Sequence, residues 1–192
     1  MRKIFFSFIA ALLILGCSDD NSNESPFNNQ EPGTVMFTID GVEYILREDD
    51  QEANTCFEAC LTNPELPLLW LRMFNPNDNS WMVVSSTNIE PGTYDLGNTT
   101  SDNPSICNNY AAYGILNVDD LDLRYFSNDD IGGSGQLTMI EFDATEELTS
   151  GTFQFTAVQL NGSGQSIIVT NGSFYKIRLR GFGGCTGPFF GG

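Results

Sequence analysis

The chain has 192 residues, with 25 Asp or Glu, 8 Lys or Arg and no His, so its formal net charge is -17 at pH 7. Without histidine, Ser-His-Asp and Cys-His catalytic systems and His-ligated metal centres are excluded. Nucleic acid binding depends on Lys and Arg displacing counterions from phosphates, so a chain this acidic is expected to have no nucleic acid partner.

Residues 1–16 have the pattern of a secretory signal peptide. Two cations precede an apolar run from Ile4 to Leu15, which is shorter than the about 20 residues that a spanning helix needs. The run closes with Ile14-Leu15-Gly16-Cys17, which resembles the lipobox of bacterial lipoproteins. This resemblance implies that Cys17 is acylated and becomes the mature N-terminus. A simple secretory signal that ends near a cysteine is the alternative.

Residues 17–33 are expected to be the acylated cysteine and a disordered tether, because they are rich in Asn, Ser and acids and poor in large apolar residues. Two or more acyl chains anchor a protein stably in a bilayer. The tract Ser18-Asp19-Asp20-Asn21 looks like the acidic segment of surface-exported lipoproteins of the Bacteroidota. That likeness implies the outer face of an outer membrane, with the periplasmic face as the alternative.

Residues 34–192 are expected to form a single β domain, and their first element is a hairpin. Asp40-Gly41 is a type I′ turn signal. The register that it sets brings three apolar pairs onto one face, which we expect to be buried: Ile39 with Val42, Phe37 with Tyr44, and Val35 with Leu46.

The segment from Gln51 to Leu61 breaks the alternating pattern. Thr55 and Glu58 have the spacing of a capping box, which predicts one short helix. Alternation then returns, and the further strands expected are 68–74, 81–87, 92–96, 112–118, 120–126 and 136–143.

The last elements are expected to form a three-stranded meander. Asn161-Gly162 and Asn171-Gly172 are the predicted turns. The residues predicted to share its core face are Phe153, Phe155, Ala157, Ile168, Tyr175 and Ile177. With about ten strands and at most one short helix, we predict an all-β fold: an antiparallel β-sandwich or a flattened β-barrel.

Three motifs between residues 90 and 180 carry a family resemblance. They are Pro91-Gly92-Thr93-Tyr94, Ser150-Gly151-Thr152-Phe153-Gln154-Phe155-Thr156-Ala157 and Val169-Thr170-Asn171-Gly172-Ser173-Phe174. The chain resembles an uncharacterised Bacteroidota lipoprotein family of unknown function. The resemblance implies a shared β architecture, and it brings no catalytic residues with it.

Four cysteines remain once Cys17 takes lipid: Cys56, Cys60, Cys107 and Cys185. Outside the cytoplasm two disulfides are expected. We favour pairings that link Cys56 and Cys60 to Cys107 and Cys185, because a four-residue spacing on a helix fits bridge geometry poorly. A four-Cys zinc site is the alternative, although the usual paired knuckles are absent from the sequence.

Acidic residues gather in short runs that have two interpretations. Asp119-Asp120-Asp122 and similar runs lack EF-hand spacing, so we interpret them as solvated strand faces, with a weak calcium site as the alternative. A pair of carboxylates would suffice for a glycosidase, but the sequence marks no pair. We therefore predict no catalytic residue, no metal site and no cofactor.

Two groups of residues are candidates for a ligand surface. Trp70 and Arg72 share one face of a strand, and because Arg72 interrupts apolar residues we expect that face to meet solvent, where Trp70 could stack on a sugar. Lys176, Arg178 and Arg180 alternate along another strand. The structural alternatives are a core tryptophan, and cations that pair with acids or protect a sheet edge.

These observations favour a non-enzymatic, lipid-anchored β domain on the cell surface that binds or scaffolds. The partner would be a glycan or another surface protein, and the membrane is contacted through the anchor. A polysaccharide hydrolase that uses a carboxylate pair and a coat lipoprotein with no specific ligand are the alternatives.

Overall fold

The computed structural model of the chain describes residues 25–50, 52–59, 65, 67–97, 108–115, 124–160 and 163–180, with only the backbone at 54 and 56–59. Within these residues there is no α-helix. One turn of 3-10 helix, η2, spans Asp129–Ile131. The strands are β1 (Thr34–Ile39), β2 (Val42–Arg47), β3 (Ala53–Ala59), β4 (Pro67–Asn75), β5 (Ser80–Ser86), β6 (Gly92–Leu96), β7 (Tyr110–Ile115), β8 (Tyr125–Phe126), β9 (Ser134–Asp143), β10 (Leu148–Gln159) and β11 (Ser166–Arg180).

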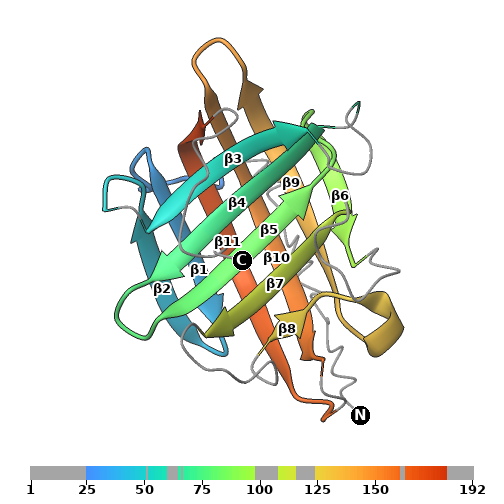
Figure 1. Cartoon of the computed structure of the whole chain (residues 1–192). Helices are drawn as coiled ribbons and strands as arrows, with labels where there is room; N and C mark the ends of the chain where they lie inside the picture. Colours follow the sequence, from blue (N-terminus) through green and yellow to red (C-terminus); the bar gives the residue numbers. More distant parts are fainter. Residues whose placement is uncertain are drawn as a thin grey trace, which may run out of the picture.

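The strands close into a flattened barrel, as Figure 1 shows. Their order is β2-β1-β11-β3-β4-β5-β7-β8-β10-β9-β6, and a further pairing between β10 and β11 closes the ring. One wall consists of β2, β1, β11, β10, β9 and β6, and the other of β3, β4, β5, β7 and β8. The pairings are antiparallel except that of β3 with the end of β11, which is parallel. The predicted all-β fold is confirmed.

The first hairpin has the predicted register. Ile39 lies opposite Val42, and the pairing continues to Val35 opposite Leu46. Asp40 and Gly41 both have positive φ, 48° and 87°, as a type I′ turn requires. Of the predicted face, Val35, Phe37, Ile39 and Leu46 are buried, Tyr44 is partly buried, and Val42 is 58% exposed beside the turn.

The helix predicted from Gln51 to Leu61 is wrong, because Ala53–Ala59 is strand β3. Its whole length pairs with β4, and its centre also meets the end of β11. The Thr55 hydroxyl is buried and donates to the carbonyl of Arg178 instead of capping a helix. Two neighbouring strands therefore outweigh a local helix signal, as tertiary context often does.

The turn predicted at Asn171-Gly172 is also wrong, because β11 runs without a break from Ser166 to Arg180. Asn171 has a positive φ of 53°, and the register with β10 shifts nearby, so the dipeptide forms a bulge. The bulge leaves Ile168 51% exposed and buries Val169 instead. The other predicted turn, Asn161-Gly162, lies outside the described residues.

The core lies between the two walls. It includes the predicted Phe153, Phe155, Ala157 and Ile177 from β10 and β11, all at most 3% exposed. From the facing wall, Leu71, Met73 and Met82 close it, together with further buried side chains of β4, β5 and β7. Because this core uses one face of each strand, the alternate side chains of β9, β10 and β11 point away from it.

Candidate ligand-binding groove

The outward face of β6, β9, β10 and β11 is a polar surface. Leu137, Met139, Phe153 and Phe155 are buried, while the residues that alternate with them are the outward ones: Gln136, Thr138, Thr152, Gln154 and Thr156. The latter carry hydroxyl and amide groups that can each donate and accept hydrogen bonds.

Strand pairing places these polar side chains in rows that cross the strands. One row is Asp95, Gln136 and Gln154, in which the Gln136 amide donates to the Asp95 carboxylate at 3.4 Å. The next row is Thr93, Thr138, Thr152 and Ser173, in which the Thr93 and Thr138 hydroxyls lie 3.0 Å apart. Neighbouring strands lie about 4.8 Å apart, so each row offers polar groups at a regular spacing.

Two adjoining hollows lie on this face, and we call them together the groove. The first, about 410 Å³, is lined by residues that include Pro26, Thr138, Thr152 and Gly172. The second, about 540 Å³, reaches Asp95, Asp129 and Thr170. Gln136 and Gln154 line both hollows, so the two hollows adjoin at these glutamines.

A glycine at the bulge packs directly against the buried Phe153 of β10. A Cβ on Gly172 would lie 2.4 Å from the carbonyl oxygen of Phe153 and 2.5 Å from its ring. No other residue type fits at that distance without displacing β10. Asn171 and Gly172 both line the first hollow, so the same bulge that corrects the predicted meander also forms part of the site.

The segment before β1 forms one rim. The Phe27 ring stacks on Tyr175 with centroids 4.8 Å apart, next to Pro26 in the hollow. Gln30 fastens the segment, because its amide donates to the carbonyl of Thr34 at 2.7 Å and its carbonyl accepts from the Ser173 hydroxyl at 2.9 Å. Of this segment, Pro26 therefore lines the first hollow, and the stacked pair of Phe27 and Tyr175 lies next to it.

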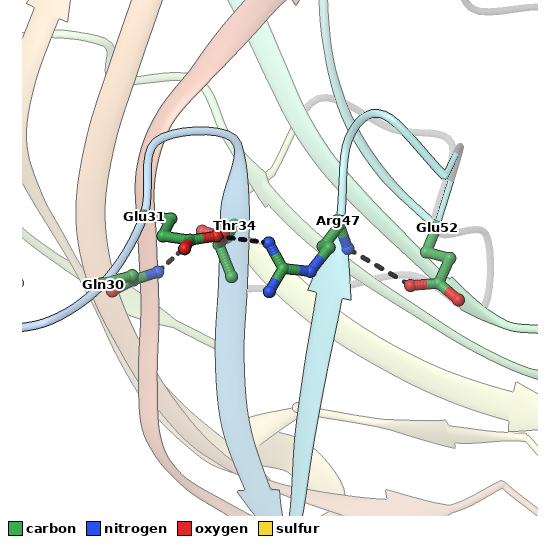
Figure 2. Close-up of polar contacts among 5 residues, drawn as sticks. All are labelled: Gln30, Glu31, Thr34, Arg47 and Glu52. Carbon is green, nitrogen blue, oxygen red and sulfur yellow. Dashed lines mark hydrogen bonds and ion pairs between the residues drawn. The ribbon is translucent and has the colours of Figure 1, made fainter.

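Figure 2 shows how the same segment is held to β2. The Arg47 guanidinium lies 2.6 Å from the Glu31 carboxylate, and the backbone amide of Arg47 donates to Glu52 at 3.3 Å. The hydrogen bond with Glu31 is the main cause that raises the pKa of Arg47. Both partners of the ion pair are exposed, so its contribution to stability is small.

The charged side chains that line the groove, among the described residues, are all acidic. Asp95 and Asp129 line its second hollow, and none of the described residues that line either hollow is Lys or Arg. Both carboxylates are exposed. An anionic ligand would meet repulsion there, whereas a neutral ligand rich in hydroxyls finds donors and acceptors along the groove.

The predicted residues Trp70 and Arg72 lie on the opposite wall, facing away from the core. The side chains are 9% and 5% exposed, and the Arg72 guanidinium sits 4.7 Å from the Trp70 ring centroid. The expectation that this face meets solvent is therefore wrong at both residues. An arginine interrupting an apolar strand is here stacked on its tryptophan neighbour, which a linear pattern does not distinguish from exposure.

The predicted cationic stripe is interrupted by a second irregularity in β11. Lys176 has a positive φ of 49°, and its ammonium lies 5.6 Å from the Tyr175 ring centroid. Arg180 approaches the buried Glu48 carboxylate at 3.9 Å, and the backbone amide of Arg178 donates to the same group. These contacts are of the kind that the acid-pairing alternative describes.

The remaining candidates fall largely outside the described residues. Cys17, Cys60, Cys107 and Cys185 do so, while Cys56 lies in β3 with only its backbone described, opposite Trp70. Lipidation and disulfide pairing therefore stay predictions. Within the described part of the chain, no three acidic or cysteine side chains converge to hold a metal ion, and no helix is long and apolar enough to cross a membrane.

Sequence reasoning did not single out the groove residues. Gln136, Thr138, Thr152 and Gln154 are visible in the sequence only as the polar half of an alternating pattern. The alternating pattern correctly predicts that these residues lie on an outward face. It does not predict which strands lie next to each other, and so it does not predict the groove.

The comparisons with known proteins give one finding. A protein-family model described as "Domain of unknown function (DUF6252)" matches residues 74–178, more than half of the chain. Neither the curated proteins nor the solved structures contain a match to the chain. The matched range holds β6, β9 and β10 entire and nearly all of β11.

Proposed function

Because the chain belongs to the DUF6252 family, a domain of unknown function whose matched range contains nearly the whole groove, we propose that the groove binds a neutral glycan without turnover. The observation that carries this proposal is that Gln136 and Gln154 line both of two adjoining hollows on a stretch of polar side chains. Side-chain amides present a donor and an acceptor side by side, which suits the paired hydroxyls of a sugar ring.

The shape of the groove favours a chain of sugars over a single one. The two hollows adjoin at the two glutamines, and the polar rows cross several strands at a constant spacing. A longer ligand would contact more of these rows at once. We therefore expect affinity to rise with the number of sugar units until both hollows are filled.

A hydrolase is the second candidate, because Asp95 and Asp129 line the same hollow. A catalytic acid works best in an apolar recess that raises its pKa, and both of these carboxylates are exposed. Binding without hydrolysis is thus the better-supported function. A coat protein with no specific ligand would show neither binding nor hydrolysis.

The cellular location, a lipid anchor at the outer membrane, is part of the same proposal. The lipobox-like sequence before Cys17 and the acidic tract after it support a Bacteroidota lipoprotein on the outer face of the outer membrane. The oxidising compartment in turn favours two disulfides among Cys56, Cys60, Cys107 and Cys185. The anchored domain would then act by holding bound glycan close to the cell surface.

A glycan array followed by calorimetry on the full chain in mild detergent tests the binding function. Gln154→Ala should weaken binding roughly two- to tenfold, because one neutral hydrogen bond is lost at about 0.5 to 1.5 kcal/mol. Gln136→Ala should act in the same direction. Gln165→Ala is the matched control, since this exposed glutamine precedes β11 and lines neither hollow.

The same experiment separates the three candidates. Saturable binding with unchanged ligand supports the proposal. Release of shortened glycan that stops in Asp95→Asn or Asp129→Asn would establish the hydrolase instead. No binding to any neutral glycan, with the chain folded, would contradict both and leave the coat protein.

A further inference from the structure

Strand β2 ends the order of strands in its wall. Among the described strands it pairs only with β1, and Figure 1 shows it at the outer margin of the barrel. A terminal strand presents a row of backbone N–H and C=O groups along its free edge, and these can pair with a strand of another molecule.

The turn decides which groups of β2 point outward. Because Asp40-Gly41 is a two-residue turn, Ile39 and Val42 form the first hydrogen-bonded pair, and pairing then alternates along the strands. The backbone groups of Glu43, Ile45 and Arg47 therefore point away from β1. The Arg47 amide agrees with this, since it donates outward to the Glu52 carboxylate.

The same three residues carry the exposed side chains of β2. Glu43, Ile45 and Arg47 are exposed, and Ile45 is 49% exposed although it is apolar. The alternate residues point inward, where Leu46 is buried and the Tyr44 ring stacks on Phe37 with centroids 5.1 Å apart. The exposed side chains along β2 are therefore acidic at Glu43, apolar at Ile45 and basic at Arg47, with the apolar residue in the middle.

We propose that β2 is a homodimer interface, at which β2 of a second copy of this chain pairs antiparallel about a two-fold axis through Ile45. In this register Ile45 faces its own counterpart, and Glu43 of each copy faces Arg47 of the other. Moving the axis by two residues would oppose Glu43 with Glu43, or Arg47 with Arg47. Charge complementarity therefore selects one register among those that the outward groups allow.

The contacts already present at Arg47 are compatible with this pairing. Glu31 occupies one terminal nitrogen of the guanidinium, and a guanidinium offers five N–H donors, so a second carboxylate can be bound. Glu52 accepts from the Arg47 N–H and donates its own N–H to the Arg47 carbonyl, so the backbone hydrogen bonds of the dimer are those that the two Ile45 residues exchange. A six-residue strand buries less than the roughly 1,200 Å² of a standard stable interface, so the dimer is concentration-dependent.

Photo-cross-linking in cells that express the full chain tests the interface. A photoreactive amino acid at position 45 should give a covalent product of twice the monomer mass on a denaturing gel. The same residue at position 140 is the matched control, because Ile140 is also exposed, at 39%, but lies on β9 and lines neither hollow, and it should give no such product.

A charge exchange then tests the register. Glu43→Arg alone, or Arg47→Glu alone, should lower the yield of the dimer at least fivefold, and the double variant should restore it to within twofold. Both residues are exposed, so we expect the variants to fold, which circular dichroism checks. Because Arg47→Glu also removes the ion pair with Glu31, Glu31→Gln is the control that removes this pair alone. Absence of the dimer, cross-links to other proteins alone, or a yield that ignores the charge changes would overturn the proposal.

Discussion

Tyr110 shows how the fold changes the chemistry of one residue. It is 5% exposed and packs with Ala112 and Phe126 on the side of β7 that faces away from the main core. Burial raises the pKa of its phenol to about 12, and the nearby Arg72 charge opposes this shift only in part. Tyr113 and Tyr44 have pKa values raised mainly by burial as well.

The raised pKa predicts a loss of stability in alkali. The folded state keeps the Tyr110 proton after the unfolded chain has lost it, so this stabilisation is complete below pH 10 and disappears as pH rises to about 12. Two pKa units correspond to about 3 kcal/mol at most. Urea unfolding at a series of pH values should show the decline, and Tyr110→Phe should flatten it. An identical decline in the variant would contradict the prediction.

At the scale of the elements, Glu48 contacts β11 at the point where this strand separates from β1 and begins to pair with β3. This buried carboxylate accepts from the amide of Arg178 at 3.2 Å and faces Arg180, while Thr55 of β3 donates to the carbonyl of Arg178. The junction therefore connects three strands through two side chains. It is also the parallel pairing by which the two walls are joined on this side.

Removing this carboxylate should loosen the junction. Glu48→Ala should lower the free energy of unfolding by about 1 to 3 kcal/mol, because the Arg178 amide loses its buried acceptor. Hydrogen exchange should speed up first in β3 and at the end of β11. Glu146→Ala, in an exposed turn, is the control and should change stability by less than about 0.5 kcal/mol. Equal effects of the two substitutions would show that Glu48 has no such role.

Two similar dipeptides show how far a local signal predicts an element. Asp40-Gly41 makes the expected turn, because the strands that it joins pair with each other over their whole length. Asn171-Gly172 has the same preference for positive φ but becomes a bulge, because β1 and β10 hold β11 on both sides of it. The positive φ at each dipeptide was therefore predictable from the residue types. Whether the chain then reverses in a turn or continues in the same strand was not.

At the scale of the whole molecule, the proposed lipid anchor is close in the sequence to the segment that forms one rim of the groove. Pro26 and Phe27, which belong to the rim segment, lie within the stretch 17–33 that was predicted to be the tether. Pro26 comes nine positions after Cys17. If Cys17 carries lipid, the groove is therefore displayed close to the membrane surface. Both proposals then describe one arrangement.

The anchor has its own test. Cys17→Ala should abolish incorporation of labelled fatty acid and move the protein from the detergent phase to the aqueous phase, because no acyl chain remains to bury. Ser18→Ala is the matched control and should keep the label. Protease treatment of intact cells should digest the native protein if it is exposed on the surface. A native protein without label would contradict the anchor.

The amino-acid sequence alone determined the all-β class and the first hairpin, since each depends on neighbours along the chain: alternation and a turn dipeptide. The proposed cell-surface location also comes from the sequence alone, from a short apolar run before a cysteine, and it stays a proposal. The tertiary structure decided the strand identity of Ala53–Ala59, the burial of Trp70 and Arg72, and the groove around Gln136 and Gln154. Those features depend on which strands lie side by side. Pairing between distant segments is set by the closing of the whole sheet, which no local pattern encodes.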